Sequence, residues 1–164
     1  MKHLLYLLLI LIFFTACKST SVIIPSKNTE VNTERTRHLI AQLIHSASEN
    51  LGVKYKSGGI TKAGFDCSGL LYFVFNSYKI QLPHSSLEQS KLGLIIDRDN
   101  IKKGDLIFFK TNRKSQINHV GMVIDISDDN VKFIHSSTSR GVIISSTKEP
   151  YYQSSFAQVN RIIR

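Results

Sequence analysis

The chain has 164 residues, of which 42% are apolar, 9 are Gly and 3 are Pro. This length and composition are typical of a single folded domain and exclude a disordered or fibrous protein. Two cysteines are too few for a disulfide-stapled scaffold, a Cys-rich zinc ribbon or an iron–sulfur site. The formal net charge of +9 favours an anionic partner. The chain carries no motif of a DNA- or RNA-reading protein, so we expect no nucleic acid.

Residues 1–16 have the layout of a secretory signal peptide. A short start that contains Lys2 precedes the apolar run Leu4–Phe14. This run is too short for a helix that crosses a hydrocarbon core of about 30 Å. Small residues then lead to Cys17, where we expect the signal peptide of a lipoprotein to end.

The ending Phe14–Cys17 resembles a bacterial lipobox, in which the cysteine is lipidated, although Phe14 stands where Leu is usual. We expect residues 17–32 to be the lipidated Cys and a polar tether, with the lipid holding the protein on a membrane. The alternative is an ordinary signal peptide with a chance cysteine at its end. Lys18 is not the Asp that resembles an inner-membrane retention signal, so we expect a cell-envelope location on the outer membrane, facing the periplasm.

Residues 33–164 are expected to form the folded domain. Its first part has apolar residues on one helical face, namely Leu39, Ile40, Leu43, Ile44 and Ala47. This spacing predicts a helix that opens at Thr33–Glu34 and ends near Gly52. A loop is expected over residues 55–65. A dense apolar run then predicts a buried helix that starts at or near Cys67, with Asp66 or Ser68 as its cap.

Farther along the chain the helical spacing of apolar residues gives way to short segments that are rich in Val, Ile and Phe. Four strands are predicted, namely Asp105–Phe109, Asn118–Ile126, Val131–His135 and Gly141–Ser145. Residues 128–130 supply turn residues between the second and the third. Helices followed by strands, without regular alternation, predict an α+β domain with an antiparallel sheet.

Cys67 is the candidate nucleophile of this domain. It is the one thiol that remains if Cys17 carries lipid. Backbone N–H groups at a helix N-terminus favour an anion, so a cysteine placed there forms a thiolate more easily. The alternative is a small buried core residue, which is common for a lone cysteine.

A nucleophilic thiol needs a base, and the base needs a group that orients it. Two of the six histidines, His119 and His135, lie in predicted strands, where each alone is more commonly a core residue. Alternation puts His119 on the face of Gly121 and Val123, and His135 on the face of Phe133. In a hairpin the two histidines come within about two residues of facing each other. The register does not close on a two-residue turn, so we expect a longer loop or a bulge.

A zinc site is the other chemistry open to these residues. Cys67, His119 and His135 with a water are a possible catalytic zinc set. The chain has neither HExxH nor CxxC spacing, and we therefore expect no metal.

Short motifs in a fixed order resemble those of the NlpC-type cell-wall cysteine peptidases. They are Gly52–Gly59, Phe65–Leu70, Leu82–Gln89, Lys103–Phe109, His119–Gly121, Phe133–Ser137 and Gly141–Ser146. The resemblance extends over residues 39–164. It implies a minimal papain-like fold, with N-terminal helices packed on a small antiparallel sheet, and hydrolysis of peptide bonds in peptidoglycan without a cofactor.

The resemblance also implies a role for each site residue. Cys67 is the nucleophile, His119 is its base and His135 orients His119. Tyr55 donates a hydrogen bond near the scissile carbonyl, and the Cys67 N–H contributes to an oxyanion hole. Ser68 flanks the nucleophile and lines the substrate groove.

One position departs from the family pattern. Relatives often carry Arg after the Leu-Pro dipeptide, and this chain has His84. This puts substrate preference in doubt but not the catalytic chemistry. Ser85 and Gln89 follow the pattern and are open to a structural interpretation as loop ties.

The bond that is cut is not defined by spacing. The segment 149–152 is similar to lipoprotein murein endopeptidases of the family, which favours the cross-link between D-alanine and the diamino acid of a neighbouring stem. Cleavage between γ-D-glutamate and the diamino acid is the alternative within the family. A non-catalytic wall-binding lipoprotein and a lipid acyltransferase are alternatives of other classes.

Overall fold

The computed structural model describes residues 27–164, with side chains from residue 30 onward. The predicted signal peptide (1–16), Cys17 and the first part of the tether lie outside the described residues. In chain order the elements are α2 (Lys27–Ser48), β1 (Ile60–Thr61), β2 (Gly64–Phe65), α3 (Cys67–Ser77), α4 (Ser86–Gln89), β3 (Leu94–Ile96), η2 (Arg98–Asn100), β4 (Leu106–Phe109), η3 (Thr111–Arg113), β5 (His119–Ser127), β6 (Asn130–Ser137), β7 (Gly141–Ser146), α5 (Pro150–Ser155) and β8 (Phe156–Arg161).

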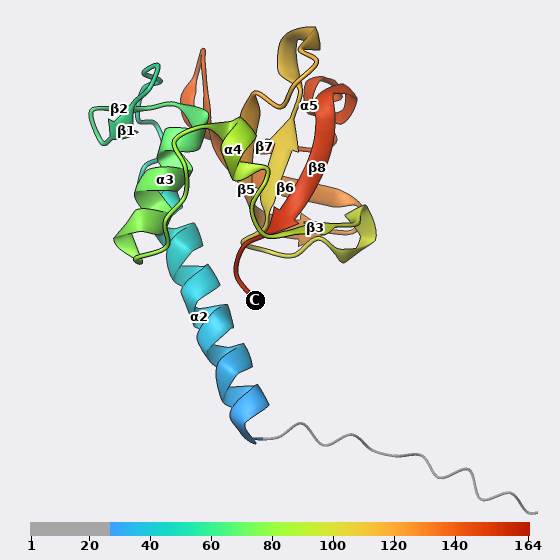
Figure 1. The fold of residues 1–164 in the computed structure, drawn as a ribbon. Helices are drawn as coiled ribbons and strands as arrows, with labels where there is room; N and C mark the ends of the chain where they lie inside the picture. Colours follow the sequence, from blue (N-terminus) through green and yellow to red (C-terminus); the bar gives the residue numbers. More distant parts are fainter. Residues whose placement is uncertain (1–26) are drawn as a thin grey trace, which may run out of the picture.

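The main sheet has six strands in the order β3-β8-β4-β5-β6-β7, and every neighbouring pair is antiparallel. Figure 1 shows α2 and α3 together on one side of this sheet and α5 at the far side, above β8. The α+β class and the antiparallel sheet predicted from the sequence are therefore confirmed. Among residues 27–164, no helix is both long enough and apolar enough to cross a membrane.

The element boundaries differ from the sequence prediction in two ways. First, α2 begins at Lys27 and not at Thr33–Glu34 as predicted, so residues 27–32 of the predicted tether are helical. No Pro or Gly follows Pro25 until the end of this helix, and Glu30 in its first turn complements the helix dipole. Second, the short hairpin β1–β2, the strands β3 and β8 and the helix α5 were not predicted. These elements are two to six residues long, so they are too short for a clear periodic pattern.

Apolar side chains fill both faces of the sheet. On one face, residues such as Leu106 and Met122 pack against α2 and α3. On the other, Phe109, Val123 and Tyr152 join a second cluster beneath α5. Because both faces are covered, the sheet is a rigid base on which side chains at its ends are held in place.

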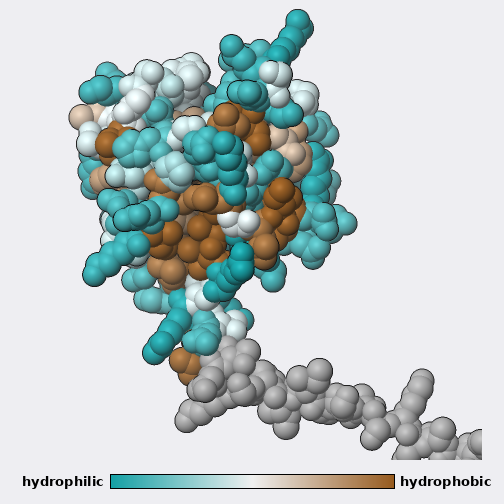
Figure 2. Space-filling view, viewed as in Figure 1, coloured by the Kyte–Doolittle hydropathy of each residue, from teal (hydrophilic) through white to brown (hydrophobic). Residues whose placement is uncertain are grey.

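The face of α2 is not fully covered by the sheet. Figure 2 shows apolar residues gathered beside α2 on an otherwise hydrophilic face. A groove of about 640 Å³ along this helix is lined by Ile40, Ile44 and Ile124, with Arg37 and Lys102 at its rim.

The pairing of β5 with β6 contains one bulge. The strands are joined by the two-residue turn Asp128–Asp129, and Asp125 pairs with Lys132. The next pair is Val123 with Phe133, so Ile124 has no partner across the ladder. The alternatives left by the sequence, a longer loop or a bulge, are thus resolved in favour of the bulge.

Gly121 lies just beyond the last β5–β6 pair, where the two strands approach so closely that a side chain would not fit without movement. A Cβ atom there would lie 2.7 Å from Phe133 Cδ2, 2.9 Å from the Ile134 carbonyl oxygen and 3.2 Å from His135 Cβ. We expect Gly121→Ala to lower the free energy of unfolding by about 1–3 kcal/mol, because these atoms must move apart. Urea denaturation measures this change, with the exposed Ser127→Ala on the same strand as a control expected within about 0.5 kcal/mol. An unchanged Gly121→Ala protein would contradict the close packing.

Candidate active site

Cys67 is the first residue of α3, as the sequence predicted. The helix is capped by Asp66, whose Oδ1 accepts a hydrogen bond from the Gly69 N–H at 2.6 Å. The Cys67 Sγ atom lies 3.9 Å from the backbone oxygen of Asn118, the residue before His119. The N-terminus of α3 therefore presents its thiol to the start of β5.

The thiol of Cys67 is held in its neutral form. Burial raises its pKa to about 11, and the negative charge of Asp66 adds to this effect. Backbone N–H groups of Val120, Ser68 and Cys67 lower the pKa, but by less than burial raises it. The expectation that the helix N-terminus favours the thiolate is thus correct in direction, but desolvation outweighs it in the resting protein.

Three buried side chains form a hydrogen-bonded row beside this thiol. His119 Nε2 lies 2.9 Å from His135 Nδ1, and His135 Nε2 lies 3.3 Å from the hydroxyl of Tyr152. All three are buried, with exposed fractions of 9%, 0% and 5%. The structure therefore brings together the two histidines singled out from the sequence and adds a tyrosine to them.

The row permits one arrangement of protons in which His119 acts as a base. Since His119 Nε2 faces His135, its Nδ1 is the nitrogen left to accept the Cys67 proton. His119 must then donate Nε2–H to His135 Nδ1, and His135 must donate Nε2–H to the Tyr152 oxygen. Tyr152 thus holds His135 in the tautomer that orients His119.

Burial also keeps both histidines neutral. It lowers the pKa of His119 to about 4. It lowers the pKa of His135 to about 3, with smaller contributions from the charges of His119 and Arg140. At neutral pH the site therefore holds a neutral thiol beside a neutral imidazole, which is the protonation state that general-base catalysis requires.

Two further residues predicted at the site lie next to Cys67. Tyr55 is partly buried, and its pKa is raised first by burial and then by the charges of Cys67 and Asp66. Ser68 is only 4% exposed. Its hydroxyl has two acceptors for its one proton, Asp66 Oδ1 at 3.0 Å and the His84 carbonyl oxygen at 2.8 Å. The Ser68 side chain is therefore already bonded within the protein.

Ser85 and Gln89, for which the sequence also allowed a purely structural role, hold the segment after α3 against the site. Gln89 Nε2 donates to the backbone oxygens of Ser68 and Pro83 at 3.1 and 2.7 Å. Ser85 caps α4. His84 is exposed, and its ring packs edge-on against the ring of Tyr72, with the two ring centroids 3.9 Å apart. Ser85 and Gln89 thus act as structural ties, as the alternative interpretation held.

The described residues offer no ligand set for a metal. Among side chains 30–164, no three His, Cys, Asp or Glu residues converge on a common point. The nitrogens of His119 and His135 that face each other are joined by a hydrogen bond. The geometry therefore favours a proton-transfer pair over the zinc alternative.

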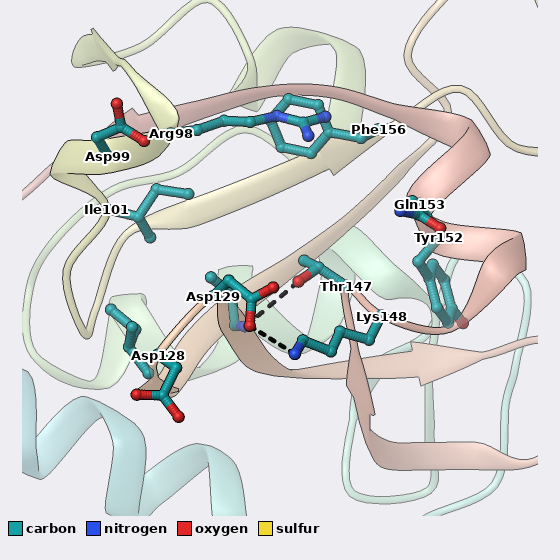
Figure 3. A pocket seen from close by; sticks show the side chains of 12 residues that line it. Arg98, Asp99, Ile101, Asp128, Asp129, Thr147, Lys148, Tyr152, Gln153 and Phe156 are labelled. Atoms are coloured by element: carbon teal, nitrogen blue, oxygen red, sulfur yellow. Dashed lines mark hydrogen bonds and ion pairs between the residues drawn. The ribbon is translucent and has the colours of Figure 1, made fainter.

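Tyr152 is the site residue that sequence reasoning missed. It belongs to α5, which is only six residues long and gives no periodic signal. Its place in the segment Glu149–Tyr152, quoted for the family resemblance, was the available clue. Tyr152 also lines a cavity of about 580 Å³, which Figure 3 shows with the side chains around it. That cavity contains the Asp129–Lys148 ion pair.

Comparisons with known proteins identify the family of this chain. The sequence matches the model of the NlpC/P60 family over residues 52–161. This chain belongs to the NlpC/P60 family. It is 34% identical over 145 residues to the protein named murein DD-endopeptidase MepS/murein LD-carboxypeptidase of Escherichia coli K12, which covers 88% of this chain and 74% of that protein. It is 42% identical over 112 residues to the probable endopeptidase NlpC of the same strain, with 68% and 70% covered.

A solved structure shows the same fold. The chain is similar to the crystal structure of an NlpC/P60 family protein from Bacillus cereus, with a TM-score of 0.69 and 35% sequence identity. The match covers 76% of this chain and 40% of that chain. The family resemblance inferred from the motifs and the fold class it implied are thus confirmed.

The protonation state of Cys67 can be measured directly. We expect no thiolate near pH 7, because burial raises the pKa of Cys67 to about 11. The difference in ultraviolet absorbance between wild type and Cys67→Ala isolates this thiol from Cys17, and it should rise only as the pH approaches 11. In denaturant the same difference should rise at lower pH, near the ordinary value of about 8.5. A thiolate signal from the folded protein at neutral pH would contradict the assignment.

Proposed function

We propose that this chain is a cell-wall hydrolase, a cysteine endopeptidase that cleaves peptide bonds of peptidoglycan. The observation that carries the proposal is that Cys67, at the capped start of α3, lies against the backbone just before His119 of β5, whose ring is hydrogen-bonded to His135 of β6. A nucleophile, a base and a group that orients the base are the parts that a thiol peptidase requires.

The reaction runs through a thioester. Cys67 Sγ attacks the scissile carbonyl carbon while His119 Nδ1 takes the thiol proton, and the oxyanion faces the backbone N–H of Cys67. As the carbon–nitrogen bond breaks, the imidazolium of His119 gives its proton to the leaving amine. A water then attacks the thioester with His119 as base, which releases the acid and restores the thiol. His135 holds the ring of His119, and Tyr55 donates to the carbonyl region.

The cross-link between D-alanine and the diamino acid of a neighbouring stem is the preferred bond. Two observations support it. The relative from Escherichia coli that matches 88% of this chain is named a murein DD-endopeptidase. The segment Glu149–Tyr152, which resembles the same group of enzymes, supplies the Tyr152 that contacts His135.

The test is a digest of purified Gram-negative peptidoglycan by the full chain in detergent, analysed by mass spectrometry. We expect cross-linked dimers to become monomeric stems, and Cys67→Ala to lower the rate at least about a thousandfold. Asn76→Ala, an exposed change on the same helix, is the matched control and should keep full activity. Shortened stems would move the cut to the γ-D-glutamyl bond. The absence of any Cys67-dependent product would favour a wall-binding protein.

We also propose that lipid on Cys17 attaches the protein to the outer membrane, facing the periplasm. The apolar run and the lipobox-like ending at residues 14–17 support this location. In a Gram-negative host, metabolic labelling with a fatty acid should mark the wild-type chain and not Cys17→Ser. Equal labelling of both proteins would exclude this anchor.

A further inference from the structure

A second cavity, of about 270 Å³, opens directly beside His119. Its walls come from η3, from the turn between β6 and β7 and from the start of α5, and they include Asn112, Arg140 and Glu149. Cys67 does not line it, so it lies on the histidine side of the site.

Arg140 supplies a positive charge to this cavity. Its side chain is exposed, and among side chains 30–164 no carboxylate lies within ion-pair distance of it. Its charge nevertheless lies close enough to His135 and Tyr152 to lower the pKa of each. A guanidinium in this position is available to a ligand.

Glu149, the other charged residue that lines this cavity, already has a hydrogen-bond partner within the protein. Glu149 Oε1 accepts a hydrogen bond from the backbone N–H of Ser146 at 2.8 Å. Figure 3 shows the other cavity, of about 580 Å³, and the cations that line it have partners. Lys148 pairs with Asp129, and Arg98 lies 3.9 Å from the ring centroid of Phe156. Arg140 therefore differs from these cations in having no partner among the described residues.

The position of the cavity indicates which part of a substrate enters it. His119 gives its proton to the leaving amine, so the residue that carries this amine must lie against His119. The cavity is lined by His119 and is open to solvent through its exposed wall at Arg140. It is thus placed to receive the leaving-group residue.

We propose that this cavity binds the leaving-group residue and that Arg140 binds a free carboxylate on the carbon next to the leaving amine. This inference rests on the proposed function. In a D-alanyl cross-link, the amine belongs to a carbon of the diamino acid that also carries a free carboxylate. In a γ-D-glutamyl bond of a stem that continues to D-alanine, the equivalent carbon carries a peptide carbonyl. Arg140 thus selects the cross-link, because a guanidinium pairs bidentately with a carboxylate and not with an amide.

The test compares two substrates that differ in one group. One is a cross-linked dimer with the free carboxylate beside the cross-link, and the other is the same dimer with this carboxylate amidated. We expect wild type in detergent to prefer the free acid about tenfold in kcat/KM, since an exposed charge pair is partly screened by solvent. Arg140→Ala should lose the preference and keep its rate on the amide, and Arg140→Lys should keep part of the preference.

Arg98→Ala is the matched control, because it removes the same charge from the other cavity and should keep the preference. The affinities for the two dimers can also be measured without turnover, in the Cys67→Ala protein and in the Cys67→Ala/Arg140→Ala protein. If wild type hydrolysed neither dimer while the Cys67→Ala protein still showed a binding preference that depends on Arg140, the carboxylate site would stand and the proposed function would be overturned. An undiminished preference in Arg140→Ala, by rate or by affinity, would overturn this proposal alone.

Discussion

The unpaired residue Ile124 in β5 is the constraint on which the site depends. Side chains alternate between the two faces of a strand, so one extra residue moves every later side chain to the opposite face. Without the bulge, continued pairing would set His135 opposite Met122, whose side chain packs under α2 and α3. With the bulge, His135 lies on the face of His119, and the two rings meet at 2.9 Å. Gly121 completes the arrangement, since a Cβ there would collide with β6.

The thiol reaches this pair from the other side of the sheet. The start of α3 is held by its Asp66 cap and by a close contact between glycines, since a Cβ on Gly69 would lie 2.0 Å from the Gly59 oxygen. Ser136 adds a hydrogen bond to the Phe65 oxygen just before the helix. These ties place Cys67 at the start of β5, where desolvation raises the pKa of its thiol. Burial therefore favours the neutral thiol of Cys67 and the neutral ring of His119.

Much of this arrangement was predictable from local signals. The start of α3 at Cys67, its Asp66 cap and the strands around His119 and His135 follow from an apolar run, a capping residue and β-rich segments. The early start of α2 was missed because polar residues hide its helical character. The edge strand β3 and the helix α5 were missed because short elements depend on tertiary packing for their stability.

The sequence by itself determined the fold class and the family, and it singled out Cys67, His119 and His135 as candidates for the chemistry, because residue type and local order carry that information. Only the tertiary structure decided how they are used. The alternation of side chains along each strand could not show where the bulge lies. The burial that raises the pKa of the thiol comes from segments far apart in the chain. Tyr152 reaches His135 only when α5 packs on the sheet. The position of Arg140 in one cavity with His119, without an ion-pair partner among side chains 30–164, is likewise a property of the folded surface.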